Sequence, residues 1–509
     1  MNTTSGPGRH GRGLLECLAR WASTLRLADV PARVRDFAAS HVLSQVAAIR
    51  SGLAQEDGRR LVRALGPPWQ QDVAQSARVL SAAGAWLNLD DTAYAGHLGP
   101  STVGVPLAYA RALGLSGAEL LRAVVVADEC AARVTAAATL GPFRGQTALH
   151  THVVGAVAGR LACERAPAEV WTDALALALS TPPWTLMRGF LTTDARLLHV
   201  SAGVRLGLDA CDAAQGGLHG AADLLEHEDG FLRQFADVPL PGAVARGLGQ
   251  RWHTETLSFK LHPGGPGIDA AIDCAVDLHA RLSAGDVDRV EEVLVEGSLY
   301  TTYAARKAEP YLDGSRTPIG ALVLTTPYPV ATALLTGGLS IHDFTPPAVE
   351  KADRWNLAAK VRLAHDPGMT RSLMRGDAPF GEALREAGDR ARPWIEKFGG
   401  QDLLELTGDL GQPLDDFTRV TKPTPARVTV RLTDGSQYVQ ERTIPRGGIG
   451  PELRAEHQEL VAAKFLEAGG PAHVVAAWPG LADTGPARLA GLIAGALADT
   501  AAADSARTD

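Results

Sequence analysis

The segment 86–106 carries polar side chains that could do chemistry inside an otherwise apolar stretch. It reads WLNLDDTAYAGHLGPSTVGVP, so Asp90, Asp91, Thr92 and His97 stand between apolar residues. Burying a carboxylate is costly unless it is paired or hydrogen-bonded, so two Asp, a Thr and a His between apolar residues indicate a functional site. The alternative is a helix end, where Asp91 or Thr92 caps the next element and His97 lies on the surface.

The composition favours a globular enzyme with a small-molecule substrate. With 509 residues, 46% hydrophobic and 21% charged, the chain can bury one large core or two ordinary ones. A net charge of −8 and the lack of a basic run argue against nucleic acid or a membrane surface as partner. Five scattered cysteines without CxxC spacing indicate neither a disulfide framework nor a zinc site. With no signal-like segment and no run of about 20 apolar residues, we expect a cytoplasmic protein.

The first half of the chain predicts a tightly packed helical domain rich in alanine and glycine. Ser116 and Glu119 have capping-box spacing before one of its helices. Apolar periodicity and Gly/Pro breaks predict helices over residues 14–25, 33–53, 73–89, 120–140, 147–166, 170–179 and 195–217.

The second half changes character and predicts a mainly α fold with a smaller α+β domain. Residues 287–303 and 427–444 show strand-like alternation, and the second range contains the hairpin signal Asp434-Gly435. We therefore expect a helical domain over 14–258 and an α+β lid domain over 259–445. A helical return over 446–498 completes the first domain, and 1–13 and 499–509 are expected to be disordered.

Several motifs, in this order, resemble the MmgE/PrpD family, which includes 2-methylcitrate dehydratase, cis-aconitate decarboxylase and iminodisuccinate epimerase. They are the DDT–His–Gly/Pro stretch, LSGAELLRAVVVADECAAR, HTHVVGAVAGRLA, LLHVSAGVRLGLDA, FKLHP, RVTVRLTDGS and ELVAAKF, and they cover most of residues 20–470. The resemblance implies a helical domain built from both ends of the chain, an inserted lid domain and a cleft between them. It also implies a homodimer that works without a metal or organic cofactor.

The resemblance also assigns catalytic residues. His97 falls on the first active-site histidine of the family, and Asp91 falls on its Asp-Asp-Thr segment. Either His150 or His152 can be the second histidine, and the spacing leaves both open. An imidazole titrates near neutral pH and can therefore give or take a proton.

Five further residues are expected to bind the substrate. Arg196 stands where relatives such as cis-aconitate decarboxylase have a carboxylate-binding lysine, and Lys260 matches the lysine that opens the lid segment. These two cations are expected to hold a carboxylate, with the guanidinium offering a planar fork. The remaining three are Asn88, Thr92 and His262.

The chain departs from the family pattern after Lys260. The family normally has a catalytic histidine a few residues later, but 264–269 reads GGPGID, and only His262 and Asp269 lie nearby. The glycines are expected to enlarge the cleft. We therefore hypothesise a dehydration, isomerisation or cyclisation of a bulkier, carboxylate-bearing or polyketide-like substrate of specialised metabolism, as in antibiotic biosynthesis. One alternative is an ordinary 2-methylcitrate dehydratase or cis-aconitate decarboxylase of primary metabolism, and another is a non-catalytic relative that only binds.

Two other histidine patterns do not by themselves predict a catalytic or metal site. His199 lies in a largely apolar helix and is expected to be a core residue. The His150-Thr151-His152 pattern has no carboxylate or cysteine in register, so no metal site is predicted.

Overall fold

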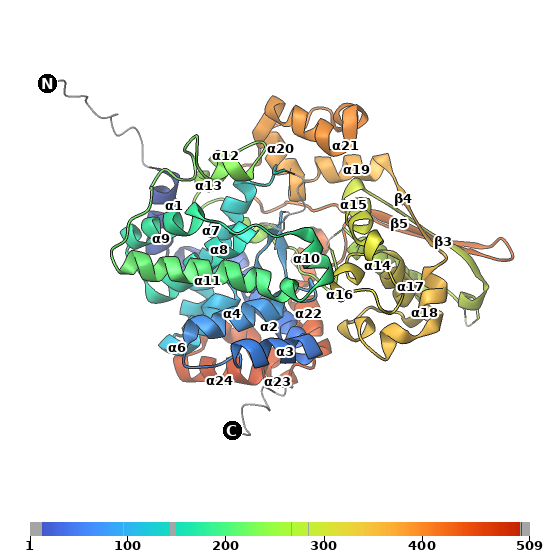
Figure 1. The fold of residues 1–509 in the computed structure, drawn as a ribbon, viewed down its shortest axis with the longest axis horizontal. Coiled ribbons are helices and arrows are strands. Elements are labelled where there is room, and N and C mark those ends of the chain that lie inside the picture. Colours follow the sequence, from blue (N-terminus) through green and yellow to red (C-terminus); the bar gives the residue numbers. More distant parts are fainter. Residues whose placement is uncertain are drawn as a thin grey trace.

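The computed structural model describes residues 13–94, 96–142, 149–265, 267–283, 285–498 and 500. The terminal segments for which we expect disorder lie outside this range, apart from Gly13 and Thr500. The larger part of the described chain is a layered bundle of helices, and a smaller part is a sheet covered by helices (Figure 1).

The helical part is formed mainly by the first half of the chain, as the sequence predicts. Its helices are α1 (Leu14–Thr24), α2 (Ala32–Ala54), α3 (Glu56–Leu65), α4 (Val73–Ala85), α5 (Gly99–Thr102), α6 (Gly104–Leu113), α7 (Gly117–Ala137), α8 (Leu149–Glu164), α9 (Ala168–Ser180), α10 (Met187–Thr192), α11 (Ala195–Gln215), α12 (Phe231–Phe235) and α13 (Gly242–Ala245). The capping box that opens α7 is present, with Ser116 N–H donating to Glu119 Oε2 at 2.9 Å.

Glycines let α8 approach the segment that carries the polar residues. A Cβ at Gly155 would lie 2.4 Å from Ser101 Oγ, and one at Gly159 would lie 2.8 Å from Pro106 Cδ. Any larger residue would push α8 away from residues 99–106, because interiors are close-packed. This contact fixes His152 of α8 relative to His97, which lies just before α5.

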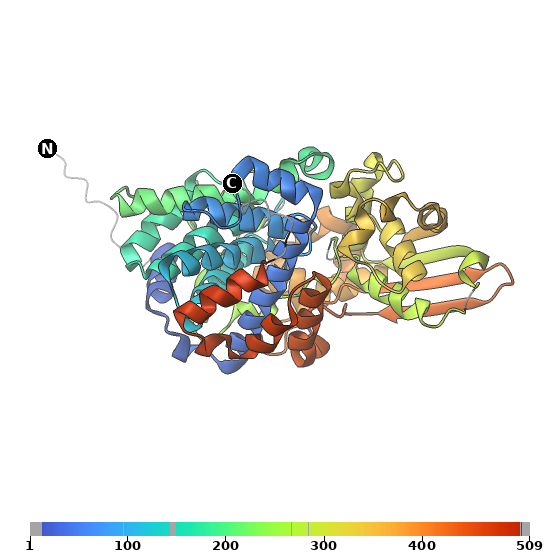
Figure 2. The same cartoon turned by 90° about the horizontal axis from the view of Figure 1, so that it is seen from below.

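The end of the chain returns to the helical part. Its helices are α22 (Pro451–Glu467), α23 (Ala472–Ala477) and α24 (Pro486–Ala496). Helix α22 packs on α2 and α24 packs on α6, so the red and blue helices lie side by side in Figure 2. Residues from both ends of the described chain thus share one hydrophobic core.

The smaller part contains a mixed four-stranded sheet in the order β4-β3-β5-β6. Strands β3 (Val290–Gly297) and β4 (Val361–His365) are parallel, and β3 is antiparallel to β5 (Ala426–Leu432), which forms a hairpin with β6 (Gln437–Arg442). The hairpin prediction for 427–444 is confirmed. Within 287–303 only β3 is a strand, because residues 287–289 form a short 3-10 turn and a helix begins after Ser298. β4 was not predicted.

Helices pack against this sheet, and further helices extend above it in Figure 1. They are α14 (Asp269–His279), α15 (Leu299–Ala308), α16 (Ile319–Leu322), α17 (Pro327–Thr336), α18 (Ala352–Ala358), α19 (Pro367–Arg375), α20 (Glu382–Ala387) and α21 (Arg392–Thr407). None of the described helices is both long and apolar enough to span a membrane.

Two hydrophobic cores divide the chain differently from the predicted boundaries. The larger core includes residues between Leu373 and Val420, which lie within the range 259–445 expected to form the lid. The smaller core includes Phe190 and Leu191 of α10, which lie within the predicted helical range. Residues 187–192 therefore join the two parts next to the polar segment.

Candidate active site

Two residues of the buried polar segment, Asn88 and Tyr94, have positive φ angles. Asn88 has a positive φ of 51°, a conformation that asparagine tolerates better than most residues. A short ladder follows, in which β1 (Thr92–Ala93) pairs with β2 (Gly96–His97). Thr92 and His97 are direct cross-strand partners, so their side chains leave the same face of this hairpin.

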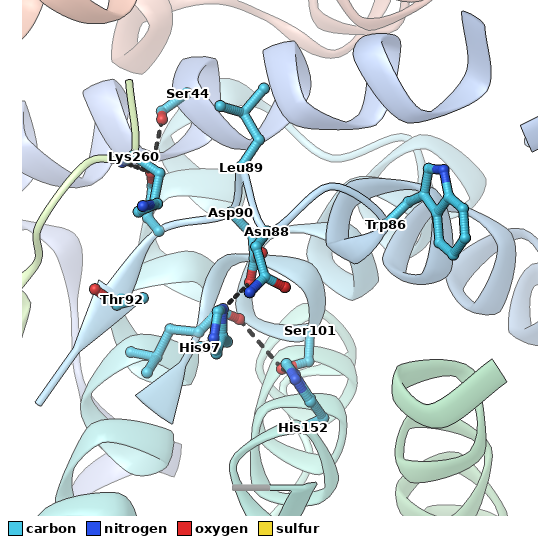
Figure 3. Close-up of polar contacts among 12 residues, drawn as sticks. Ser44, Trp86, Asn88, Leu89, Asp90, Thr92, His97, Ser101, His152 and Lys260 are labelled. Atoms are coloured by element: carbon cyan, nitrogen blue, oxygen red, sulfur yellow. Dashed lines mark hydrogen bonds and ion pairs between the residues drawn. The ribbon is translucent and has the colours of Figure 1, made fainter. Parts of the chain in front are cut away.

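The closest pair of titratable groups in the segment is Asp90 with His97. His97 Nδ1 lies 2.7 Å from Asp90 Oδ2, and the carboxylate is buried while the imidazole keeps 21% exposure (Figure 3). Burial raises the pKa of Asp90, but the charge and hydrogen bond of His97 more than offset this and hold the pKa below its ordinary value. An ionised Asp90 accepts the Nδ1 proton, which leaves the Nε2 lone pair of a neutral His97 available as a base.

Two more histidines share a pocket of about 290 Å³ with this pair. His152 Nδ1 lies 3.2 Å from Ser101 Oγ, and the His152 and His199 rings are 6.4 Å apart. Burial lowers the pKa of His152 to about 3 and that of His199 to about 4, so both are neutral near pH 7. The lining consists of Ala85, Asn88, Asp90, His97, His152, Phe190, His199 and Val200. His199, expected in the core, thus lines the pocket.

His150 points away from this pocket. Its ring packs edge-on against Phe231 and Phe235, with centroid distances of 5.3 and 6.1 Å. Its Nε2 has no hydrogen-bond partner among the described residues, and burial lowers its pKa to about 4. Two residues apart on a helix, His150 and His152 face opposite directions. Of the two histidines that spacing left open, His152 is the one in the pocket.

Asp91 lies in a buried charge cluster instead of in the pocket. Its Oδ1 accepts hydrogen bonds from Ser44 Oγ at 2.8 Å and the Lys260 backbone N–H at 3.1 Å. Lys464 Nζ lies 3.6 Å from the same oxygen, and His41 Nε2 lies 3.7 Å from Oδ2. Asp91 therefore connects α2, α22 and the start of the lid segment. These contacts indicate a role in stability and not in catalysis.

Arg196 and Lys260 do not meet to form the expected carboxylate clamp. The Arg196 guanidinium is buried and donates to Trp86 O at 2.9 Å, Asn88 Oδ1 at 2.6 Å and Gly320 O at 3.3 Å. It also lies over the Phe190 ring, 4.2 Å from the centroid. Arg196 thus supports the pocket wall and joins it to the lid, while Lys260 lies elsewhere.

Lys260 lines a second pocket, of about 220 Å³, together with Thr92 of the β1–β2 hairpin. Its Nζ contacts both carboxylate oxygens of Asp269, at 2.6 and 2.7 Å. A second buried lysine, Lys422, donates from Nζ to Thr92 Oγ1 at 2.8 Å. The full lining is Thr92, Ser258, Phe259, Lys260, Asp269, Lys422, Thr424, Pro445, Gly447 and Gly448.

His262 lines neither pocket. Its Nε2 lies 3.2 Å from Asp273 Oδ1 and its Nδ1 lies 3.4 Å from Leu339 O. Burial lowers the pKa of His262, but Asp273 more than offsets this and raises it. The contacts place His262 in an ion pair inside the lid.

The glycines at 264–267 do not open either described pocket. A Cβ at Gly264 would lie 2.7 Å from Val323 O, and a Cβ at Gly267 would lie 3.1 Å from Thr301 Cα. These glycines allow close packing within the lid. Pro266 between them lies outside the described residues.

Several residues that line the two pockets are not among the predicted site residues. The sequence predicts Asp91 as catalytic, whereas its neighbour Asp90 lines the pocket. Lys422 and Thr424 gave no signal, since they lie in an irregular stretch more than 300 residues from Thr92 and follow no periodic pattern.

Comparison with family models identifies both halves of the chain. Residues 16–241 match the MmgE/PrpD N-terminal domain, and residues 262–383 match the MmgE/PrpD C-terminal domain. The resemblance seen in the sequence is confirmed. The first match contains Asp90, His97 and His152, and the second contains Asp269, whereas Lys422 lies beyond both.

Proposed function

Because the chain belongs to the MmgE/PrpD family, whose members are generally dehydratases and lyases, we propose that it removes a proton next to a carboxylate of a compact organic acid. The observation that carries this proposal is the 2.7 Å contact between Asp90 and His97. A buried, ionised carboxylate on Nδ1 orients the ring and leaves Nε2 as the base toward the pocket.

Each step of the proposed reaction has a named group. His97 Nε2 takes the proton from carbon, and the electron pair left behind is delocalised into the adjacent carboxylate. Arg196, whose guanidinium hydrogen-bonds to Asn88 in the wall of this pocket, supplies the positive charge that stabilises the developing negative charge. The pair then forms a carbon–carbon double bond as the β-hydroxyl group leaves. The hydroxyl takes the proton that His97 Nε2 accepted from carbon, so it leaves as water and His97 returns to its starting state. His152 and His199, both neutral, hydrogen-bond to that hydroxyl group.

The packing around the pockets supports a compact substrate. The His97 pocket is bounded by the apolar side chains of Ala85, Phe190 and Val200. The glycine run, which motivated the expectation of a bulky specialised metabolite, packs inside the lid. We therefore favour the alternative, an acid of the size of 2-methylcitrate or cis-aconitate, over a polyketide-like molecule.

A product screen tests this proposal. We expect purified protein to convert at least one compact hydroxy or unsaturated di- or tricarboxylic acid, as seen by the appearance or loss of olefinic proton signals in NMR spectra. The His97→Gln variant should convert it about 10²- to 10⁴-fold more slowly, because it lacks the base. Conversion of polyketide-like acids alone would contradict a compact substrate, and equal conversion by His97→Gln would contradict the assigned base.

A further inference from the structure

Lys422 is a buried charge that the proposed reaction does not use. Its side chain is 2% exposed, and its Nζ donates to Thr92 Oγ1 at 2.8 Å. Among the described residues, no carboxylate lies within the 4.0 Å of an ion pair with it. Buried ammonium groups are normally paired with an anion, since an unpaired one is costly to desolvate.

Thr424 adds an unsatisfied polar atom to the same cavity. Its Oγ1 is buried and has no hydrogen-bond partner among the described residues, although the side chain is only 1% exposed. A hydroxyl can donate one hydrogen bond, so a missing partner in a polar cavity points to a ligand with acceptor atoms. Lys422 and Thr424 both line the pocket of about 220 Å³.

The charges of the cavity do not balance. Lys260 is neutralised by Asp269, which contacts it with both oxygens. Lys422 therefore adds one positive charge when protonated. Burial lowers the pKa of Lys422 to about 7, with Asp269 opposing this and Lys260 adding to it. Asp269 and Lys260 are the charged groups that act on Lys422. Near neutral pH Lys422 is therefore only partly protonated, and its positive charge has no negative partner among the described residues of the cavity.

We propose that Lys422 Nζ and Thr424 Oγ1 form a subsite that binds a carboxylate of the substrate. The subsite lies beside the base, because Thr92 lines this cavity and is the cross-strand partner of His97. Such partners have Cβ atoms about 4.5–5.5 Å apart. One acid can thus place its carboxylate on Lys422 and its adjacent carbon at His97, and this last step rests on the proposed function.

The proton balance of binding follows from the charge of Lys422. A bound carboxylate favours the ammonium form and raises the pKa of Lys422 toward its ordinary value, near 10.4. Proton uptake should therefore be small at pH 6, about half a proton per ligand at pH 7, and close to one proton at pH 8.

Calorimetric titration measures this uptake directly. Malonate and citrate serve as probes, each titrated at pH 6, 7 and 8 in buffers of different ionisation enthalpy. We expect wild-type protein to take up protons in the amounts given above. Lys422→Met should bind at least about tenfold more weakly and without this uptake, since it loses a charged hydrogen bond. Lys422→Arg should keep binding without proton uptake, because its guanidinium stays charged.

Matched variants separate this subsite from other effects. Lys351→Met changes an exposed lysine and should leave both affinity and uptake unchanged. Thr424→Val should weaken binding while keeping the proton uptake. Failure of both probes to bind at tens of millimolar, binding without proton uptake, or unchanged affinity in Lys422→Met would each overturn the subsite. His97→Gln should bind malonate and citrate with wild-type affinity. The titration therefore tests the subsite independently of whether His97 is the base.

Discussion

The Asp90→Asn variant is expected to lose about 10²- to 10⁴-fold in kcat/KM for the acid identified by the product screen. Asp90 accepts the Nδ1 proton of His97 at 2.7 Å, and its pKa stays below the ordinary value despite burial. An asparagine amide can donate to Nδ1 instead. The ring proton would then move to Nε2, which removes the lone pair that faces the pocket.

The control for Asp90→Asn is the same change at an exposed site. Asp313 forms a surface pair with Arg316, and Asp313→Asn should leave kcat/KM unchanged. Circular dichroism and the urea midpoint would show that Asp90→Asn is folded. A loss smaller than tenfold in folded Asp90→Asn would mean that the carboxylate does not set the protonation of His97.

Removing Asp91 should instead act on stability. Asp91→Ala is expected to lower the free energy of unfolding by about 3–5 kcal/mol, because it leaves buried charges unpaired. Lys464 lies 3.6 Å from Asp91 and His41 lies 3.7 Å from it, and all three side chains are almost completely buried. Burial raises the pKa of Asp91 and lowers that of Lys464, because both charges have left water. Urea denaturation followed by tryptophan fluorescence would measure the loss.

A double variant tests whether the cost comes from the unpaired charge. Asp91→Leu combined with Lys464→Met removes both charges and should recover most of the stability that Asp91→Ala loses. Asp313→Ala, at an exposed pair, should change stability by less than about 1 kcal/mol. If Asp91→Ala also lowered the free energy of unfolding by less than about 1 kcal/mol, the cluster would not stabilise the contact between α2, α22 and the lid segment.

Regular elements could be predicted because their signals are local. The capping box at Ser116, the hairpin at Asp434-Gly435 and the alanine-rich helices depend on residues close in sequence. The parallel strand β4 depends on pairing with β3, which lies more than 60 residues earlier. Its five residues carry no alternation strong enough to mark it.

The composition of the site was harder to predict because side-chain direction is a tertiary property. The sequence could not distinguish Asp90 from Asp91, although one lines the pocket and the other faces Ser44 and Lys464. Arg196 has the charge expected of a carboxylate ligand, but each of its three nitrogens already donates to a backbone carbonyl or to Asn88.

The most direct test of the account is hydrogen exchange at carbon. Wild-type protein and His97→Gln would each be incubated in deuterium oxide with the acid that the enzyme converts, and the signal of the proton next to the carboxylate would be followed by NMR. We predict that wild-type protein replaces this proton with deuterium and that His97→Gln does so about 10²- to 10⁴-fold more slowly. Equal exchange in both proteins, or conversion of the acid with that proton retained in the product, would contradict proton removal by the Asp90–His97 pair.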